Sequence, residues 1–289
     1  MKGGQRMSHQ RKIRTKSASR RIQYAVMGLI TLAVIIPFLW MLLLSFKSNS
    51  EIFNNPLSIP ANWSFENYVR AIHTLDFVQL YGNTFFIVLI TIAIELVITF
   101  SSSFVLARMS FENHRLKKLL YGFLIMGLTI SPFILLFPVY KINTILHLKE
   151  KLGLVLPYIA SSVSFNTLLF VAYLKALPGE IDEASIIDGC NLFQLITRVV
   201  VPMAKPVIAT VVIFNVLYIW NEFPFASIML HDTKNYTLAL GASFFKGKYN
   251  IDYAGIIASS VLMIIPQLVF YTLFQKSIVD GVTAGAVKG

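Results

Sequence analysis

Long uncharged apolar runs are the feature that most constrains what this chain can fold into. A helix needs about 20 apolar residues to cross a hydrocarbon layer about 30 Å thick. Six runs in the 289-residue sequence reach that length, and two of them contain one acidic residue each. The runs are Ile22–Phe46, Phe77–Ala107 (with Glu95), Leu119–Tyr140, Leu152–Leu174, Pro206–Leu230 (with Glu222) and Tyr253–Gln275. We predict six transmembrane helices, because the runs lack the two-residue alternation of barrel strands and a helix satisfies its own backbone.

The composition supports a membrane protein and excludes several other classes. Hydrophobic residues make up 56% of the chain and charged residues 13%, against about 25% charged in soluble domains. The net charge of +11 does not indicate nucleic-acid binding, because the basic residues bracket the apolar runs and do not gather on one surface. Cys190 is the only cysteine and the five histidines are scattered, so we expect no metal site. The first run is much longer than the 7–15 residues of a signal-peptide core, so we expect it to remain as a membrane helix.

Lys and Arg residues in the connections predict the orientation. The tails and connections on one side carry 17 of these residues, and those on the other side carry 8. Cytoplasmic connections are enriched in Lys and Arg, so both termini are predicted to be cytoplasmic. We expect a basic tail (1–21), a six-helix membrane domain (22–275) and a second cytoplasmic tail (276–289).

The first external connection is long enough to fold locally. It covers about 37 residues from Lys47 to Asn83, and the second membrane helix is expected to begin near Asn83 or Thr84.

The longest internal connection, Lys175–Lys205, lies between the fourth and fifth predicted spans and carries structural signals of its own. Residues 177–179 (Leu-Pro-Gly) are a turn signal. An acidic helical stretch follows from Glu180 to Asp188 and ends at Gly189, and acids in the first turns suit the positive end of a helix dipole.

A second short helix is predicted directly afterwards. Asn191 is its expected N-cap, with Gln194 completing a capping box; Pro202 is expected to end it, and Pro206 to open the fifth span. Its apolar residues fall on one stripe: Leu192, Leu195, Ile196, Val199 and Val200. From these residues alone the connection is either a handle for a soluble partner or an ordinary link between membrane helices.

Three segments resemble a known family. Residues 177–190 (Leu-Pro-Gly-Glu-Ile-Asp-Glu-Ala-Ser-Ile-Ile-Asp-Gly-Cys), followed by Val201-Pro202 and Pro206, closely resemble the EAA signature of bacterial ABC importer membrane subunits. The ending Gly281–Gly289 and the segment Trp220–Phe223 resemble the maltose/oligosaccharide-type branch of these permeases. The chain departs from the pattern at Ser185, where a second alanine is commoner, and at Cys190, where a small residue is usual.

The resemblance implies a coupling helix in the internal loop (177–206) that seats in a cleft of a separate ATPase subunit. Glu183 would contact a basic group there, Ala184 and Ser185 would allow close approach, and the C-terminal tail would reach the ATPase dimer. Gly189 would permit the turn that follows, and Asp188 would fix it through its side chain. The implied coupling residues are Glu183, Ala184, Ser185, Asp188, Gly189, Gly285 and Lys288.

The chain has no G-x-x-x-x-G-K-[ST] phosphate loop, so it offers no site for ATP. We expect no cofactor in this chain, with ATP and Mg²⁺ bound by the partner ATPase. The implied partners are a homologous permease, two ATPase subunits, an extracytoplasmic sugar-binding protein and membrane lipid, but not nucleic acid. The implied activity is ATP-driven import of a sugar, an oligosaccharide, across the cytoplasmic membrane.

Two acids inside the predicted spans are candidates for the substrate path. A carboxylate near a helix centre costs about 3 kcal/mol to insert, so Glu95 and Glu222 are expected to face the bundle interior or a wet cavity. Trp220 and Asn221 stand beside Glu222 and together offer a ring and hydrogen-bonding groups for a sugar. The alternatives are structural hydrogen bonds between helices and a proton-coupled secondary transporter that uses both acids. A membrane enzyme is less well supported, because the chain offers no nucleophile–base set.

Overall fold

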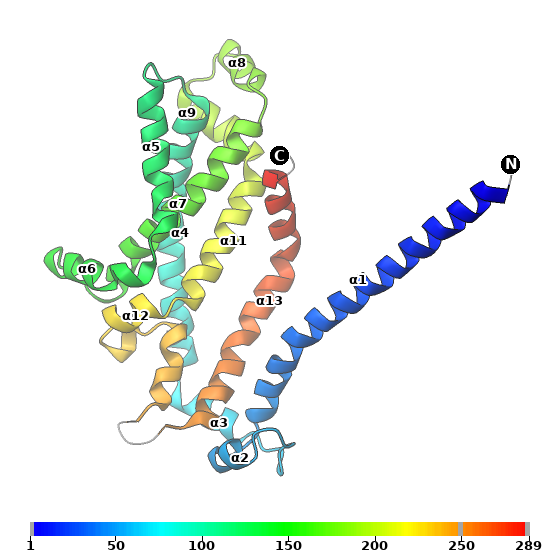
Figure 1. Cartoon of the computed structure of the whole chain (residues 1–289). Coiled ribbons are helices and arrows are strands. Elements are labelled where there is room, and N and C mark those ends of the chain that lie inside the picture. Colours follow the sequence, from blue (N-terminus) through cyan, green and yellow to red (C-terminus); the bar gives the residue numbers. More distant parts are fainter. Residues whose placement is uncertain (1–2, 248–250, 287–289) are drawn as a thin grey trace. The chain divides into compact units, whose positions relative to one another are not determined.

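The computed structural model describes residues 3–247 and 251–286, and over these ranges it forms helices but no β-strand (Figure 1). This confirms the all-α class. The longest helices are α1 (Gly3–Leu44), α4 (Phe77–Arg108), α5 (His114–Met126), α6 (Pro132–Ile145), α7 (Glu150–Ala176), α11 (Lys205–Asn221) and α13 (Tyr253–Ala286). The shorter helices are α2 (Asn49–Asn54), α3 (Glu66–Thr74), α8 (Glu180–Ile187), α9 (Leu192–Gln194), α10 (Val201–Met203) and α12 (Pro224–Met229). Turns of 3₁₀ helix cover Gly127–Thr129, Thr233–Asn235 and Leu238–Phe245, and a π-helix covers Leu195–Val200.

Four of the predicted spans are single helices long and apolar enough to cross a membrane. They are Gln23–Leu44, Phe77–Arg108, Glu150–Ala176 and Tyr253–Gln275. The second of the predicted spans is helix α4, which begins at Phe77. This start is earlier than the predicted start near Asn83. Both tails also continue the adjoining helices over their described residues, since α1 begins at Gly3 and α13 reaches Ala286.

The third predicted span is not a continuous helix. The segment His114–Thr129 and helix α6 meet at an angle of 105°, and α6 turns away from α5 in Figure 1. Ser131 has extended backbone angles just before Pro132, as expected for a residue that precedes proline. Pro132 then occupies the first turn of α6, where its missing N–H is not needed. The length of the apolar run predicted that this segment is helical, but it did not predict the change of direction between α5 and α6.

The fifth predicted span also breaks. Helix α11 ends at Asn221, Glu222 is extended, and α12 begins at Pro224. The preceding helical segment Leu192–Met203 meets α11 at 75°. That segment ends at Met203, one residue beyond Pro202, which was predicted to end it.

By chain contacts the protein forms two compact units. One contains the residues up to Ala71 together with Phe245–Val261, and the other contains Ile72–Phe244 and the chain from Leu262 onward. Helix α7 is the centre of the second unit, because 61% of its most apolar stretch is buried, compared with 39% for α4. One apolar core surrounds Tyr158 and the α11–α12 break, and another joins α4 and α7 to the start of α11.

The connection that follows the first span folds locally, as predicted, and its residues up to Ala71 lie in the first unit. Lys47 is fully buried, and its ammonium group donates to the carbonyl of Asn55 at 2.7 Å and to the hydroxyl of Ser58 at 3.1 Å. The amide of Asn67 donates to the carbonyls of Ser45 and Lys47 at 2.8 and 2.9 Å. These bonds satisfy the buried polar groups of a connection that has only two short helices.

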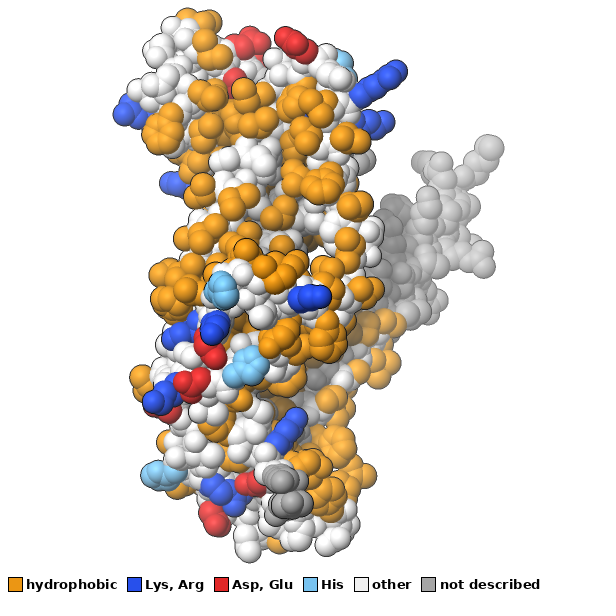
Figure 2. All heavy atoms as spheres, turned by 90° about the vertical axis from the view of Figure 1, so that its left-hand side faces the viewer, with side chains coloured by type: hydrophobic (Ala, Val, Ile, Leu, Met, Phe, Trp, Pro, Cys, Tyr) orange, Lys and Arg blue, Asp and Glu red, His pale blue; other side chains and the backbone are white. Residues whose placement is uncertain are grey.

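The surface carries the apolar character of the sequence. Figure 2 shows hydrophobic side chains spread over much of the face that it draws, with charged side chains among them. No residue in the most apolar stretch of α1 is buried. Such a helix has lipid or another protein as its natural surroundings.

Candidate coupling site and intramembrane polar groups

The predicted acidic helix of the internal loop forms where the sequence placed it. Helix α8 carries Glu180, Asp182 and Glu183 in its first turn, where negative charge is favourable. Three backbone hydrogen bonds close the turn that follows, from the amides of residues 188, 189 and 190. Gly189 has φ +82°, a conformation that side chains disfavour, so this glycine is needed. The closing bonds join backbone groups, and the side-chain bond expected from Asp188 is not among them.

The second short helix begins as predicted. The side chain of Asn191 accepts from the amide of Gln194 at 2.9 Å, and the side chain of Gln194 accepts from the amide of Asn191 at 3.0 Å. On the predicted apolar stripe, Leu195 and Val200 are buried, whereas Leu192 is 51% exposed. The stripe therefore packs the loop onto the membrane helices, except at its first residue.

Arg108, at the end of α4, fixes α8 to the helices beneath it. Its guanidinium donates to the carbonyls of Leu177 at 2.7 Å and Pro178 at 2.9 Å, and it also reaches Leu174 at 3.3 Å. The same group pairs with Asp182 of α8 through two contacts of 2.8 and 2.9 Å. Only 8% of the Arg108 side chain is exposed. The contact from Nη2 to Asp182 Oδ1 is a hydrogen bond, whereas Nε lies 2.8 Å from Oδ2 as an ion pair without hydrogen-bond geometry. Arg108 ties α4, the end of α7 and α8 into one unit.

The sequence analysis used Arg108 only to predict orientation. Its role could have been anticipated from an arginine in the last turn of one helix and an acid in the first turn of another. The pairing of those two helices, however, is not visible in a single sequence.

The exposed face of α8 is mixed acidic and apolar. Glu183, Ala184 and Asp188 are exposed, and Ile186 and Ile187 are 62% and 85% exposed. Ser185 lies on the other face, buried at 8% exposure, with its hydroxyl donating to the Ile181 carbonyl at 2.7 Å. Its small size therefore serves packing within this chain. Gly285 lies near the end of α13, and Lys288 lies outside the described residues.

Glu222 sits at the helix break and is fully bonded within its own chain. Its carboxylate accepts from the amides of Phe225 at 2.7 Å and Ala226 at 3.1 Å, which caps α12. It also accepts from the hydroxyl of Tyr158 on α7 at 2.6 Å. Only 6% of Glu222 is exposed, so these three bonds replace water around the group.

The other candidates for the substrate path do not join Glu222 in one set. The Trp220 ring lies 5.9 Å from that of Tyr81 on α4, and its N–H is buried without a partner. Asn221 is exposed, and its amide donates to the carbonyl of Leu217. Their predicted role in contacting a sugar remains a prediction.

Glu95 lies in the interface between α4 and α7. It is fully buried, and neither carboxyl oxygen has a hydrogen bond of normal geometry. Ser162 and Asn166 of α7 lie beside it. Asn166 accepts from the amide of Asn215 on α11 at 2.9 Å, which links a third helix to this polar group.

Comparison with known proteins agrees with this architecture. The model of the family described as binding-protein-dependent transport system inner membrane component matches residues 101–282. A diacetylchitobiose uptake system permease of Streptomyces coelicolor is 31% identical over 278 residues, covering 94% of this chain and 91% of its own. A trehalose/maltose transport system permease of Thermococcus litoralis is 29% identical, covering 91% and 96%.

Among solved structures, the fold is similar to that of a bacterial ABC transporter involved in the import of the acidic polysaccharide alginate. The TM-score is 0.76 at 20% identity, and the match covers 91% of this chain and 97% of the other. At this identity the likeness shows the fold alone.

A set of apolar helices with a short acidic helix held at one end defines a multi-pass membrane permease of the ABC transporter class. The chain belongs to the family of binding-protein-dependent transport system inner membrane components, and it is a protein of the cytoplasmic membrane.

Proposed function

We propose that this chain is one permease subunit of an ATP-driven importer. The importer carries an oligosaccharide across the cytoplasmic membrane by alternating access. The chain works with a homologous permease, two ATPase subunits and an extracytoplasmic sugar-binding protein. Relatives named for diacetylchitobiose and for trehalose/maltose transport support the cargo. A similar fold solved with a pentasaccharide-bound periplasmic protein supports the binding-protein partner.

The observation that carries the proposal is the presentation of α8. Its exposed Glu183, Ile186 and Ile187 offer an acidic and apolar surface to a partner, and Arg108 connects that surface rigidly to α4 and α7. A movement of α8 would therefore be passed to the helix pair at the centre of its unit. A partner that moves α8 would have to supply about 5.5 kcal/mol of differential binding to take an inward–outward equilibrium from 1:99 to 99:1.

The proton-coupled alternative has less support from the geometry. Glu222 is capped by three donors of its own chain, and Glu95 is fully buried between helices. Neither carboxyl group lies in an open path in this conformation. An uncoupler that stops uptake while the ATPase remains active would favour that alternative.

The test is co-purification of the detergent-solubilised complex. Glu183→Lys reverses the charge at the centre of the exposed face, and Gly189→Pro forbids φ +82°, because proline holds φ near −65°. Both variants are expected to lose the ATPase subunits while keeping the second permease. The controls are Glu112→Lys, an exposed acid outside α8, and Gly179→Ala, where φ is −71° and nothing lies within 4 Å of an added Cβ.

A native chain that purifies without an ATPase, and still transports in proteoliposomes without ATP, would overturn the proposal. Equal loss of the ATPase from the two control variants would show that α8 is not the contact.

A further inference from the structure

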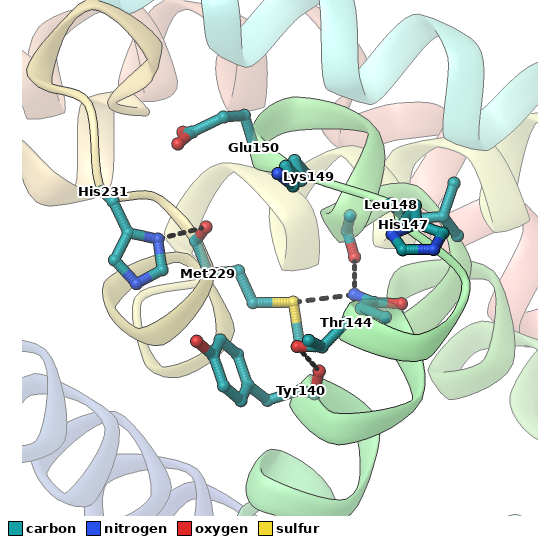
Figure 3. Close-up of a pocket in the computed structure, with 10 residues that line it drawn as sticks. Tyr140, Thr144, His147, Leu148, Lys149, Glu150, Met229 and His231 are labelled. Carbon is teal, nitrogen blue, oxygen red and sulfur yellow. Dashed lines mark hydrogen bonds between the residues drawn. The ribbon is translucent and has the colours of Figure 1, made fainter.

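A cavity of about 340 Å³, with both apolar and polar side chains in its lining, lies between the end of α6, the connection to α7 and the chain that follows α12 (Figure 3). This volume is near the lower end of the range of about 300–1,000 Å³ for ligand pockets. The distribution of Lys and Arg predicts that the connection between α6 and α7 lies on the extracytoplasmic side of the membrane. The cavity is lined by Tyr140, Asn143, Thr144, His147, Leu148, Lys149, Glu150, Gly153, Met229 and His231.

One buried side chain holds the three walls together. The amide of Asn143, which is 4% exposed, donates to the carbonyl of Gly153 at 2.6 Å and to the sulfur of Met229 at 3.1 Å. A Cβ at Gly153 would meet the Leu148 carbonyl at 3.2 Å and the Asn143 amide at 3.3 Å. The close approach of α6, α7 and the end of α12 is therefore built into the sequence at this point.

The rim of the cavity carries local strain. His147 and Glu150 have φ of +55° and +53°, and they are the non-glycine residues with positive φ in the described chain. Such conformations are unfavourable for residues with a side chain and cluster at ligand sites. In addition, one carboxylate oxygen of Glu150 is buried without a hydrogen-bond partner. A buried unpaired acceptor is costly. In this conformation the oxygen is closed off from the cavity, so a ligand hydroxyl would satisfy it once the Glu150 side chain turned toward the cavity.

The lining selects a class of ligand by its mixed charge. Glu150 disfavours an anion and Lys149 disfavours a cation, while the Thr144 hydroxyl and the Tyr140 hydroxyl offer hydrogen bonds to a neutral polar molecule. The rings of Tyr140 and His231 lie 6.3 Å apart on one side, and Glu150 and Lys149 lie across the cavity from Tyr140 in Figure 3. Flat rings with donors and acceptors around them suit a neutral ring that bears several hydroxyl groups.

We propose that this cavity binds one neutral saccharide unit of the cargo at the outer end of the permease. The proposal rests on the proposed sugar import and adds a site in this subunit. The volume has room for a small unit and not for a long oligosaccharide, so the site would hold one end of the cargo.

The test uses a cysteine placed in the cavity of the complete transporter in nanodiscs, without the binding protein. Cys190 is the only cysteine of this chain, so in a Cys190→Ser background Thr144→Cys is its single thiol, and labelling is read from the band of this subunit on a gel. The probe is whichever of maltose, trehalose and diacetylchitobiose the same complex takes up when the binding protein is added. Saturating sugar is expected to slow maleimide labelling of Thr144→Cys several-fold, and Glu150→Gln or Tyr140→Ala is expected to remove this protection.

Thr233→Cys is the matched control, because Thr233 is exposed but does not line the cavity. Labelling there should not change with sugar. If the complex transports a sugar that gives no protection at Thr144→Cys, the site is overturned and sugar import stands. If the complex transports none of the three sugars and no other oligosaccharide, the proposed cargo fails and the saccharide site fails with it.

Discussion

Two carboxyl groups buried in the apolar helices, Glu222 and Glu95, have opposite surroundings. Glu222 accepts three hydrogen bonds at the break between α11 and α12. Glu95 lies inside the unbroken α4 and accepts none of normal geometry. The difference follows from the backbone, because the first amides of a helix have no partner in their own helix and remain free for a side chain. Inside a continuous helix the amides are already used, so an acid there depends on neighbouring side chains.

This comparison separates two roles that the sequence could not separate. Glu222 stabilises the helix break in this conformation, whereas Glu95 remains unsatisfied between α4 and α7. A conformation in which the helices pack differently and supply a hydrogen-bond donor to Glu95 would be more stable at this position. Glu95 is therefore the acid whose substitution should alter the balance between conformations more than the fold.

The largest effect is expected for Glu222→Ala. The substitution leaves two backbone amides and the Tyr158 hydroxyl buried without an acceptor, and each such group costs about 1–3 kcal/mol. We expect the free energy of unfolding of the purified protein in detergent to fall by about 3 kcal/mol or more. Glu66→Ala, at an exposed position in α3, should change it by less than about 0.5 kcal/mol. Equal stability of the two variants would contradict the capping role.

Tyr158→Phe removes one of the three bonds and keeps the ring. A hydrogen bond to a charged group contributes about 1.5–3 kcal/mol to stability. The free energy of unfolding in the same assay should therefore fall by about 2 kcal/mol. In the Glu222→Ala background the additional loss should be smaller, because the two changes remove the same interaction. Tyr24→Phe, on the exposed part of α1, is the control and should have no effect.

The sequence predicted the parts of this molecule that follow from local patterns. Four of the six apolar runs formed single membrane-length helices. The acidic helix α8, the turn at Gly189 and the capping box of Asn191 and Gln194 also formed as expected, because each depends on residues a few positions apart. The direction of α6 and the end of α11 did not follow from apolar length. They depend on Pro132 and Glu222, whose effects are set by the geometry of the break.

The pairings between distant segments could not be predicted for a different reason. Arg108 with Asp182, and Tyr158 with Glu222, join residues more than 60 positions apart, and one sequence carries no record of such contacts. The same is true of the cavity, whose walls come from three separate helical segments.

Glu95→Gln is expected to have a smaller effect, and one of opposite sign to Glu222→Ala. A neutral amide avoids the cost of burying a carboxylate without partners and can donate to Asn166 or Ser162 beside it. We expect stability to stay the same or to rise by about 1 kcal/mol in the unfolding assay. Glu222→Gln, which loses a charged acceptor, should be destabilised in parallel. If both glutamine variants were destabilised to the same extent, the contrast between the two sites would be lost.

The smallest effect concerns Glu51, which caps a helix as Glu222 does but is accessible to water. Its carboxylate accepts from the amides of Ser48 at 3.0 Å and Ala61 at 3.2 Å, and these bonds lower the pKa of Glu51 below its ordinary value. A lowered pKa means that the cap stabilises the fold above the ordinary pKa and loses this contribution as the pH falls through the folded value.

Hydrogen exchange of residues 48–61 should therefore be faster in Glu51→Gln than in the native protein at about pH 7. The difference should disappear once the pH is well below the folded pKa of Glu51, where both side chains are neutral. A difference that persisted at low pH would show that shape, and not charge, makes this cap. When Glu51 is replaced, water can bond to the amides that it leaves free, so the loss of structure should stay local. When Glu222 is replaced, its donors are buried, so the backbone at the break between α11 and α12 should unfold.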